Sequence, residues 1–170
     1  MVTARTPRKA APPGGEGVKI LATNRKARHD YHVEETFETG IALQGNEVKS
    51  IRQGQATLRD GYAAFEHGEL FLLNCHVTPY EQAGKFHADP IRPRKLLMRR
   101  EQLRRLIGKV EEKGLTLVPL SLYLKGPHVK VSLGLARGKW EYDRREDIKA
   151  REAEREVARA SRGRANQYDD

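Results

Sequence analysis

Alternating apolar and polar residues predict several β-strands in the middle of the chain. Residues 31–43 mix β-branched and aromatic side chains and predict a long strand with a break at Gly40. Residues 62–66 and 69–77 are two apolar runs separated by a short turn, and this pattern predicts a β-hairpin. The core candidates of the long strand are Val33, Phe37, Ile41 and Leu43.

A helical pattern and a second pair of strands follow. Apolar residues recur at helical spacing from Leu103 to Val110, and the pattern stops at Gly114. Residues 115–125 and 128–136 then predict two strands around a turn, and Pro119 indicates a bulge or an edge position in the first of them. A shorter helix is expected within residues 45–54, which two glycines bound.

These elements predict a mainly β fold. About six short antiparallel strands with about three flanking helices describe a small barrel rather than a parallel sheet. We place the barrel in residues 23–136. Residues 1–22 are rich in Pro, Gly, Lys and Arg and predict a disordered basic arm. Residues 137–170 predict a charged tail that is only conditionally helical.

Charge points to a polyanionic partner. The net charge is +9 and the pI is near 9.8, which favours nucleic acid or another anionic surface. Residues 1–28 hold seven basic side chains against Glu16, a net +6, whereas residues 29–136 hold 15 against 13, a net +2. Within that centre, residues 92–105 carry seven basic side chains against Glu101, a net +6, and predict a basic patch on the folded domain.

The tail is nearly neutral, with ten basic and nine acidic side chains in residues 137–170, a net +1. A helix there has no apolar face to pack and is marginal by itself in water. It is either a solvated charged segment without a partner or a segment that folds when its arginines meet a polyanion. On such a helix five arginines fall on one narrow stripe: Arg144, Arg151, Arg155, Arg159 and Arg162.

Residues typical of catalysis are few. No glycine-rich loop precedes Lys109, and the HxxH of His29 and His32 has no further metal ligand near it. We therefore expect no catalytic residue, no metal and no cofactor. The one acid–base pair that a small ribonuclease could use is His29 with Glu34 or Glu35.

The remaining pattern favours an RNA-binding barrel in the cytoplasm. Carboxylates on an otherwise basic surface can accept hydrogen bonds from base or ribose donors. The one cysteine, Cys75, and the lack of a leader or of a run of about 18 apolar residues predict a protein that is neither secreted nor membrane-spanning. A structural ribosomal or rRNA-binding protein would share these properties and is the alternative interpretation.

Six segments of the chain, taken together, resemble the SmpB family of bacterial SsrA-binding proteins. They lie between about Asn24 and Lys149: "NRKARHDYHVEETFETGIALQGNEVKSIRQGQATLRDGYA", "PYEQ", "DPIRPRKLLM", "RLIGKVEEKGLTLVPLSLYLKG", "VKVSLGLARGK" and "DRREDIK". The resemblance implies an oligonucleotide-binding (OB)-like barrel and a non-enzymatic protein that binds the tRNA-like domain of transfer-messenger RNA (SsrA). It also implies delivery of that RNA to stalled ribosomes for trans-translation, in which the incomplete protein is tagged for degradation.

The resemblance also implies partners and site residues. The partners are transfer-messenger RNA, the 16S rRNA of the small ribosomal subunit, and elongation factor Tu on the aminoacylated RNA; we expect the protein itself to be a monomer. Asn24, Glu38 and Leu97 match residues of the family's RNA-binding surface. The basic residues beside them complete the predicted surface: Arg25, Lys26, Arg28, Arg92, Arg94 and Lys95.

A second set of residues is implied to act on the ribosome. His29 matches a family histidine that faces the decoding region. "RGKWEYDRR" resembles the family's tail motif Gly-Lys-Lys-x-x-Asp-Lys-Arg, with Trp140 in place of the second lysine, so that a ring able to stack on a base replaces a cation. We expect the tail to occupy the empty mRNA channel near the decoding centre through Gly138, Lys139, Trp140, Tyr142, Asp143, Arg144, Arg145, Ile148, Lys149, Arg151 and Arg155.

Overall fold

The computed structural model describes residues 17–85, 88–139 and 141–165. The chain divides into two compact units, residues 1–138 and residues 139–170. In the described ranges no helix is both long enough and apolar enough to cross a lipid bilayer.

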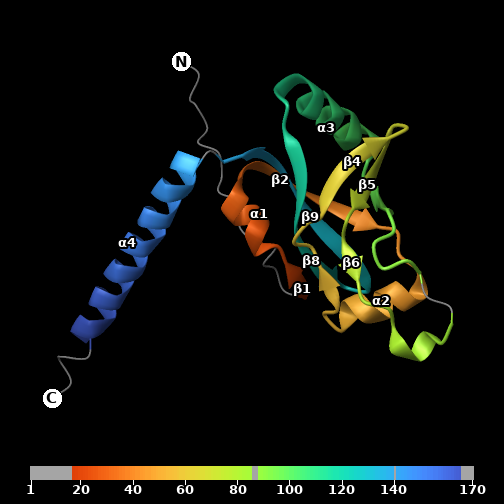
Figure 1. Ribbon diagram of the computed structural model, residues 1–170, viewed down its shortest axis with the longest axis horizontal. Helices are drawn as coiled ribbons and strands as arrows, with labels where there is room; N and C mark the ends of the chain where they lie inside the picture. Colours follow the sequence, from red (N-terminus) through yellow and green to blue (C-terminus); the bar gives the residue numbers. More distant parts are fainter. Residues whose placement is uncertain (1–16, 86–87, 140, 166–170) are drawn as a thin grey trace. The chain divides into compact units, whose positions relative to one another are not determined.

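The first unit is built on a closed antiparallel barrel of six strands (Figure 1). Each strand pairs with the next around the ring, and the sixth returns to the first. The predicted mainly β barrel is therefore confirmed. Around the ring the strands are β8 (Thr116–Lys125), β4 (Tyr62–Glu66), β5 (Glu69–Leu73), β7 (Arg94–Leu97), β2 (Tyr31–Ile41) and β9 (His128–Gly138).

The turns follow from local sequence. β4 and β5 form the predicted hairpin, and its turn residues His67 and Gly68 both have positive φ, 51° and 76°, as a tight primed turn requires. In β8 the register shifts between Pro119 and Ser121, the bulge that the proline indicated. The irregularity of β2 lies between Val33 and Glu35 rather than at the predicted break.

Alternate residues of the strands fill the interior of the barrel. On the opposite face of β9, Gly134 permits close packing against a second apolar cluster beside α1, because an added Cβ would lie 3.1 Å from Cδ1 of Leu120. The core is aliphatic and includes Leu70, Leu72, Leu96, Leu117, Leu122, Val131, Leu133 and Leu135, all at most 3% exposed. The side chain of Cys75 is buried as well, and burial raises the pKa of its thiol to about 11.

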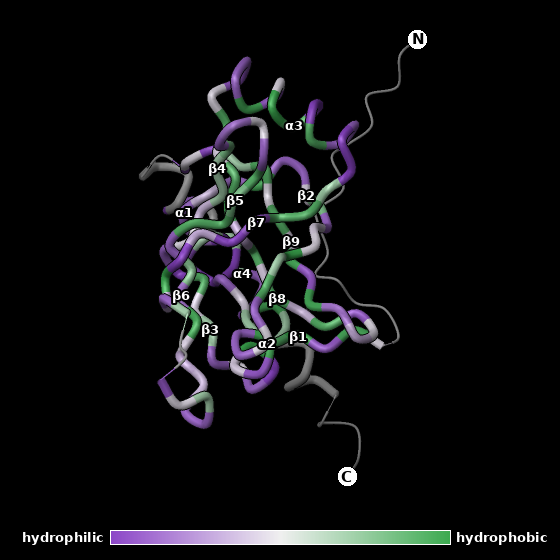
Figure 2. The backbone as a smooth tube through the Cα atoms, turned by 90° about the vertical axis from the view of Figure 1, so that its right-hand side faces the viewer, coloured by the Kyte–Doolittle hydropathy of each residue, from purple (hydrophilic) through white to green (hydrophobic). Residues whose placement is uncertain are grey.

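Three helices flank the barrel. The helices α2 (Gly45–Arg52) and α3 (Arg100–Lys113) were both predicted, and they lie toward opposite ends of the barrel in Figures 1 and 2. The helix α3 ends at Gly114, which takes the left-handed conformation, and buries Leu106 in the core. The sequence pattern did not indicate the short α1 (Arg25–Asp30), nor the small elements β3 (Ala56–Thr57), β6 (His76–Val77) and η1 (Glu81–Ala83).

The prediction of a disordered arm through residue 22 is wrong for its last residues. Residues Val18–Thr23 form strand β1, which pairs with the half of β8 beyond Ser121. The arm was predicted from composition, whereas "VKILAT" contains enough apolar and β-branched residues to extend an existing sheet. The rest of the predicted arm, residues 1–16, lies outside the described residues.

The boundary between barrel and tail also differs from the prediction. Arg137 and Gly138 continue β9 and pair with His32 and Tyr31 of β2. The second unit therefore begins at Lys139, two residues later than predicted, and its one element is the helix α4 (Glu141–Ala165). A helix in this segment agrees with the arginine spacing.

Candidate nucleic-acid interface

Asn24 holds α1 onto the barrel. Its Oδ1 accepts a hydrogen bond from the backbone N–H of Ala27 and so caps the helix, while its Nδ2 donates to the carbonyls of Leu58 and Pro119 at 2.9 and 3.0 Å. The residue is only 2% exposed. All the strong bonds of this amide are therefore made inside the protein, and its predicted contact with RNA is replaced by a structural role in positioning α1.

Replacing Asn24 by alanine should destabilise the protein by about 2 kcal/mol, because a helix cap is lost and two buried carbonyls lose their donor. Chemical denaturation followed by circular dichroism measures this loss. The neighbouring exposed change Arg25→Ala is the control and should alter the free energy of unfolding by less than about 0.5 kcal/mol. Equal stability of the two variants would show that the amide does not hold the helix.

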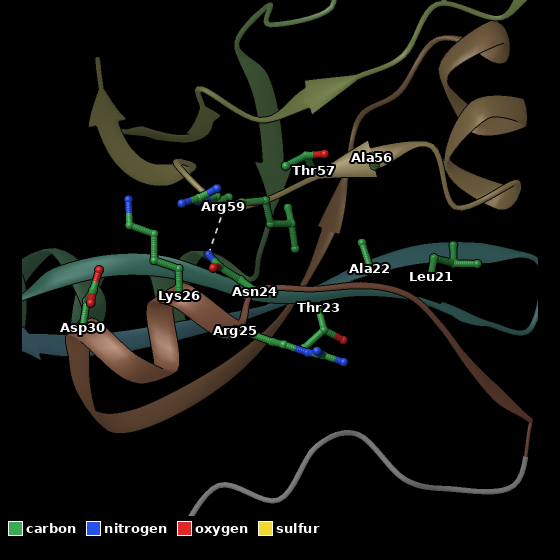
Figure 3. A pocket seen from close by; sticks show the side chains of 11 residues that line it. Leu21, Ala22, Thr23, Asn24, Arg25, Lys26, Asp30, Ala56, Thr57 and Arg59 are labelled. Carbon is green, nitrogen blue, oxygen red and sulfur yellow. Dashed lines mark hydrogen bonds between the residues drawn. The ribbon is translucent and has the colours of Figure 1, made fainter. Parts of the chain in front are cut away.

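The cap directs basic side chains of α1 toward a hollow of about 530 Å³ (Figure 3). Lys26 and Arg59 lie on one side of Asn24 and Arg25 lies on the other. Lys26 is neutralised by Asp60, 3.0 Å away, whereas no ion pair of Arg25 or Arg59 occurs within the described ranges. The predicted basic residues Arg25, Lys26 and Arg28 are exposed on α1.

In β7 the alternation of side chains divides the predicted basic patch. Arg94 points inward and is 0% exposed, and its guanidinium donates to Glu47 of α2 and to the carbonyls of Cys75 and Pro90. Arg92 also donates to Glu47, with 2.9 Å between Nε and Oε1. The prediction that Arg94 binds RNA is therefore wrong, because a strand turns every second side chain inward. Arg92 lies in the loop before β7 and is engaged in the same network through Glu47.

Glu47 is the centre of this buried network. Burial raises the pKa of its carboxyl, but hydrogen bonds from Arg92, from the backbone N–H of Gln44 and from Arg94 outweigh this effect and hold the pKa below its usual value. The carboxylate is thus ionised at neutral pH, and it ties α2 to β7 and to the loop before β7.

The outward-facing residues of β2 and β7 form the surface on which the sequence-predicted Glu38 and Leu97 meet. Gly40 pairs with Leu97 and with Lys130, and Glu38, two residues before Gly40, faces the same side of the sheet. Leu97 is 50% exposed and contributes an apolar area to this surface. We define the barrel patch as Glu38, Lys95, Leu97, Lys125 and Lys130.

Glu38 has a defined electrostatic environment. It accepts hydrogen bonds from the hydroxyl of Tyr123 at 2.7 Å and from Nζ of Lys125 at 3.0 Å. The Tyr123 hydroxyl and then Lys125 lower the pKa of its carboxyl, while burial and the carboxylate raise the pKa of Tyr123. The carboxylate is therefore ionised and held in one place, as an acceptor for base or ribose donors must be.

The acid–base pair considered for a ribonuclease is not assembled. Nδ1 of His29 lies 2.8 Å from Oδ1 of Asp30, its neighbour in α1. Glu34 instead pairs with Arg137 of β9 at 3.1 Å, and Glu35 pairs with Lys109 of α3. Each carboxylate thus faces a cation rather than the histidine.

The predicted tail residues lie on more than one element. Gly138 is the last residue of β9, and Tyr142, Asp143, Arg144, Arg145, Ile148, Lys149, Arg151 and Arg155 all belong to α4. Within α4, Ile148 is 40% exposed and Lys149, Arg151 and Arg155 are exposed. Lys139 precedes the helix, and Trp140 lies outside the described residues.

Sequence reasoning missed several residues that shape these surfaces. Lys125 and Lys130 belong to the barrel patch, Tyr123 holds Glu38 beneath it, and Arg59 lines the hollow beside α1. The alternation of Val129 and Val131 with Lys130 and Ser132 was the available indication, because alternation implies a polar outer face. A single sequence does not show how neighbouring strands are aligned. This alignment decides which side chains share one end of the barrel.

Comparison with known proteins identifies the family of this chain. The SsrA-binding protein of Symbiobacterium thermophilum is 61% identical over 155 residues, which cover 90% of this chain and 96% of the relative. That of Bacillus subtilis is 56% identical over 150 residues, covering 88% and 96%. A chain from a solved structure described as "tmRNA-SmpB: a journey to the center of the bacterial ribosome" is 54% identical with a TM-score of 0.60, over 71% of this chain and 85% of that one. The family model "SmpB protein" matches residues 21–163, and the chain therefore belongs to the SmpB family.

Proposed function

We propose that this protein binds transfer-messenger RNA through its barrel and carries it onto stalled ribosomes for trans-translation. The observation that carries the proposal is the 61% identity to an SsrA-binding protein over 155 residues, a span long enough to include both barrel and tail. The protein acts in the bacterial cytoplasm as a binding partner without catalytic chemistry of its own.

The barrel patch supplies suitable chemistry for a tRNA-like RNA. Glu38 is an ionised acceptor for exposed base or ribose donors, and Lys125 and Lys130 are cations beside it that can approach phosphates. Leu97 adds an apolar surface on which a base or ribose can lie. The α1 residues Arg25, Lys26 and Arg28 form a separate basic surface, from which His29 faces the decoding region of the small subunit.

The tail is the part of the protein that binds the ribosome. The helix α4 presents Arg151, Arg155 and Arg159 on one stripe, all exposed, and these contact 16S rRNA phosphates in the empty mRNA channel. Because every described side chain of α4 is exposed, the helix gains little from packing, and its stability depends on this polyanion. Elongation factor Tu joins through the aminoacylated RNA, and one protein monomer binds each RNA.

A salt titration tests the proposal. The full chain and residues 1–138 are each titrated with the tRNA-like domain of transfer-messenger RNA and with an unrelated duplex of equal length. Both forms should prefer the tRNA-like domain at physiological salt by at least about tenfold. If both RNAs bind equally with the same steep salt dependence, only generic phosphate contact remains, and a structural rRNA-binding protein becomes the better assignment.

A further inference from the structure

Several outward-facing cations of the first unit form ion pairs within the protein. Four such pairs join side chains from different elements: Lys95 with Glu69, Lys109 with Glu35, Lys125 with Glu38 and Arg137 with Glu34. By contrast, Arg100 and Arg104 of α3 are exposed and have no ion pair in any of the described ranges. The charge of residues 92–105 that remains available therefore lies on α3 rather than on β7.

These two arginines border a hollow of about 550 Å³ between α3 and β7. They are four residues apart and so lie on the same face of the helix. In Figure 2 hydrophobic and hydrophilic residues alternate along α3. The hollow is lined by α3, by the end of β7 with Met98 after it, and by the start of β5, where Leu70 lies beside Glu69, the ion-pair partner of Lys95. We define the α3 groove by Lys95, Leu97, Met98, Arg100, Arg104 and Ile107.

The α3 groove combines two kinds of surface. Its apolar residues, Leu97, Met98 and Ile107, can cover the face of an unstacked base, while the guanidinium groups of Arg100 and Arg104 can donate to phosphate oxygens. A base-paired duplex keeps its bases stacked inside and offers no base face to an apolar surface. The groove therefore fits an unpaired RNA segment better than a duplex.

We propose that the α3 groove holds an unpaired segment of transfer-messenger RNA, with phosphates on Arg100 and Arg104 and one base over Leu97 and Ile107. This inference rests on the proposed function and extends the interface from the barrel onto α3. The same RNA reaches both surfaces because Leu97 lines the α3 groove and also the hollow beside Gly40 and Lys130. The barrel patch and the α3 groove are thus continuous at this one side chain.

Adjacent arginines of α3 provide a matched test. Arg104 lines the groove, whereas Arg105 is equally exposed but does not line it. The variant Arg100→Gln/Arg104→Gln should bind transfer-messenger RNA about tenfold more weakly than wild type, because two charge-assisted phosphate contacts are lost. The slope of log K against log salt should fall by about 1.4 in magnitude, the value for two phosphates of a single strand. Arg104→Gln should lose more affinity than Arg105→Gln, which carries the same charge change.

A competition experiment distinguishes binding of an unpaired RNA segment from general attraction to phosphate charge. Against wild type, a single-stranded RNA should displace transfer-messenger RNA more effectively than a duplex of equal length, and Arg100→Gln/Arg104→Gln should remove this difference. Equal affinities of Arg104→Gln and Arg105→Gln would overturn the inference while leaving the proposed function intact. Normal binding of transfer-messenger RNA by the double variant, with weaker binding to isolated small ribosomal subunits, would assign the groove to rRNA and also overturn it. Loss of RNA preference in the wild-type protein would instead contradict the proposed function itself.

Discussion

Glu47→Gln should lower the free energy of unfolding by about 3 kcal/mol and the Tm by roughly 10 °C. The substitution removes the carboxylate that accepts hydrogen bonds from Arg92 and Arg94, and it leaves the Arg94 guanidinium, which is 0% exposed, without a counter-charge. It also weakens the capping box in which Glu47 accepts a hydrogen bond from the backbone N–H of Gln44. Differential scanning calorimetry at neutral pH measures the effect.

The exposed pair of Lys95 and Glu69 provides the control. Glu69→Gln removes one carboxylate from a solvent-exposed ion pair and should cost less than about 0.5 kcal/mol. If Glu47→Gln were as mild as Glu69→Gln, the network would not hold α2 against β7.

The stability difference caused by Glu47→Gln should also depend on pH. The pKa of Glu47 in the folded protein lies below its ordinary value of 4.5, so its ionised form stabilises the fold fully above pH 4.5. As the pH falls from 4.5 through the folded pKa, the wild-type carboxyl is protonated and this advantage disappears. The difference in Tm between wild type and Glu47→Gln should therefore narrow in that range. A difference that stayed constant down to pH 2 would show that the lost interaction is not one of charge.

Removal of residues 139–170 should abolish tagging on stalled ribosomes and change the affinity of the barrel for transfer-messenger RNA by less than about threefold. The truncated protein ends at Gly138, so β9 keeps its full pairing with β2. Arg137 also keeps its ion pair with Glu34. The net charge of the removed segment is zero, with nine basic residues against nine acidic ones, and long-range attraction to RNA is therefore nearly unchanged. In vitro tagging of a stalled peptide and equilibrium RNA binding are measured on the same preparations.

A shorter truncation controls for the loss of chain length. A protein that ends at Ala165 keeps the whole of α4 and should retain most of its tagging. Equal losses of RNA affinity and tagging in the longer truncation would contradict the assignment of separate roles to barrel and tail.

The elements that sequence analysis predicted are those that local chemistry determines. The hairpin turn at His67 and Gly68 and the stop of α3 at Gly114 both require positive φ, and the residues there tolerate it. The helix α3 also carries its own apolar periodicity. These features depend on neighbours a few positions away, and a single sequence displays them.

The misassigned residues depend on distant partners. Arg94 resembles its basic neighbours in sequence, and only its acceptor Glu47, 47 positions away, shows that it is buried and not available to RNA. Asn24 likewise donates to Pro119, 95 positions away. The four-residue strand β7 is too short for a distinct alternation, so its inward and outward residues could not be separated. Resemblance to a family indicates a region of the surface, but it does not distinguish an exposed side chain from a buried one that supports its neighbours.

The position of β9 in the barrel has a mechanical consequence. This strand is hydrogen-bonded along nearly its whole length to β2 on one edge and to β8 on the other, and the chain passes directly from its last residue, Gly138, toward the tail. A tension applied to the tail would act along the axis of β9, and the hydrogen bonds of both edges would then be loaded together in shear rather than broken one after another. If the ribosome binds the tail while the RNA binds the barrel, as proposed, β9 is the element that resists their separation.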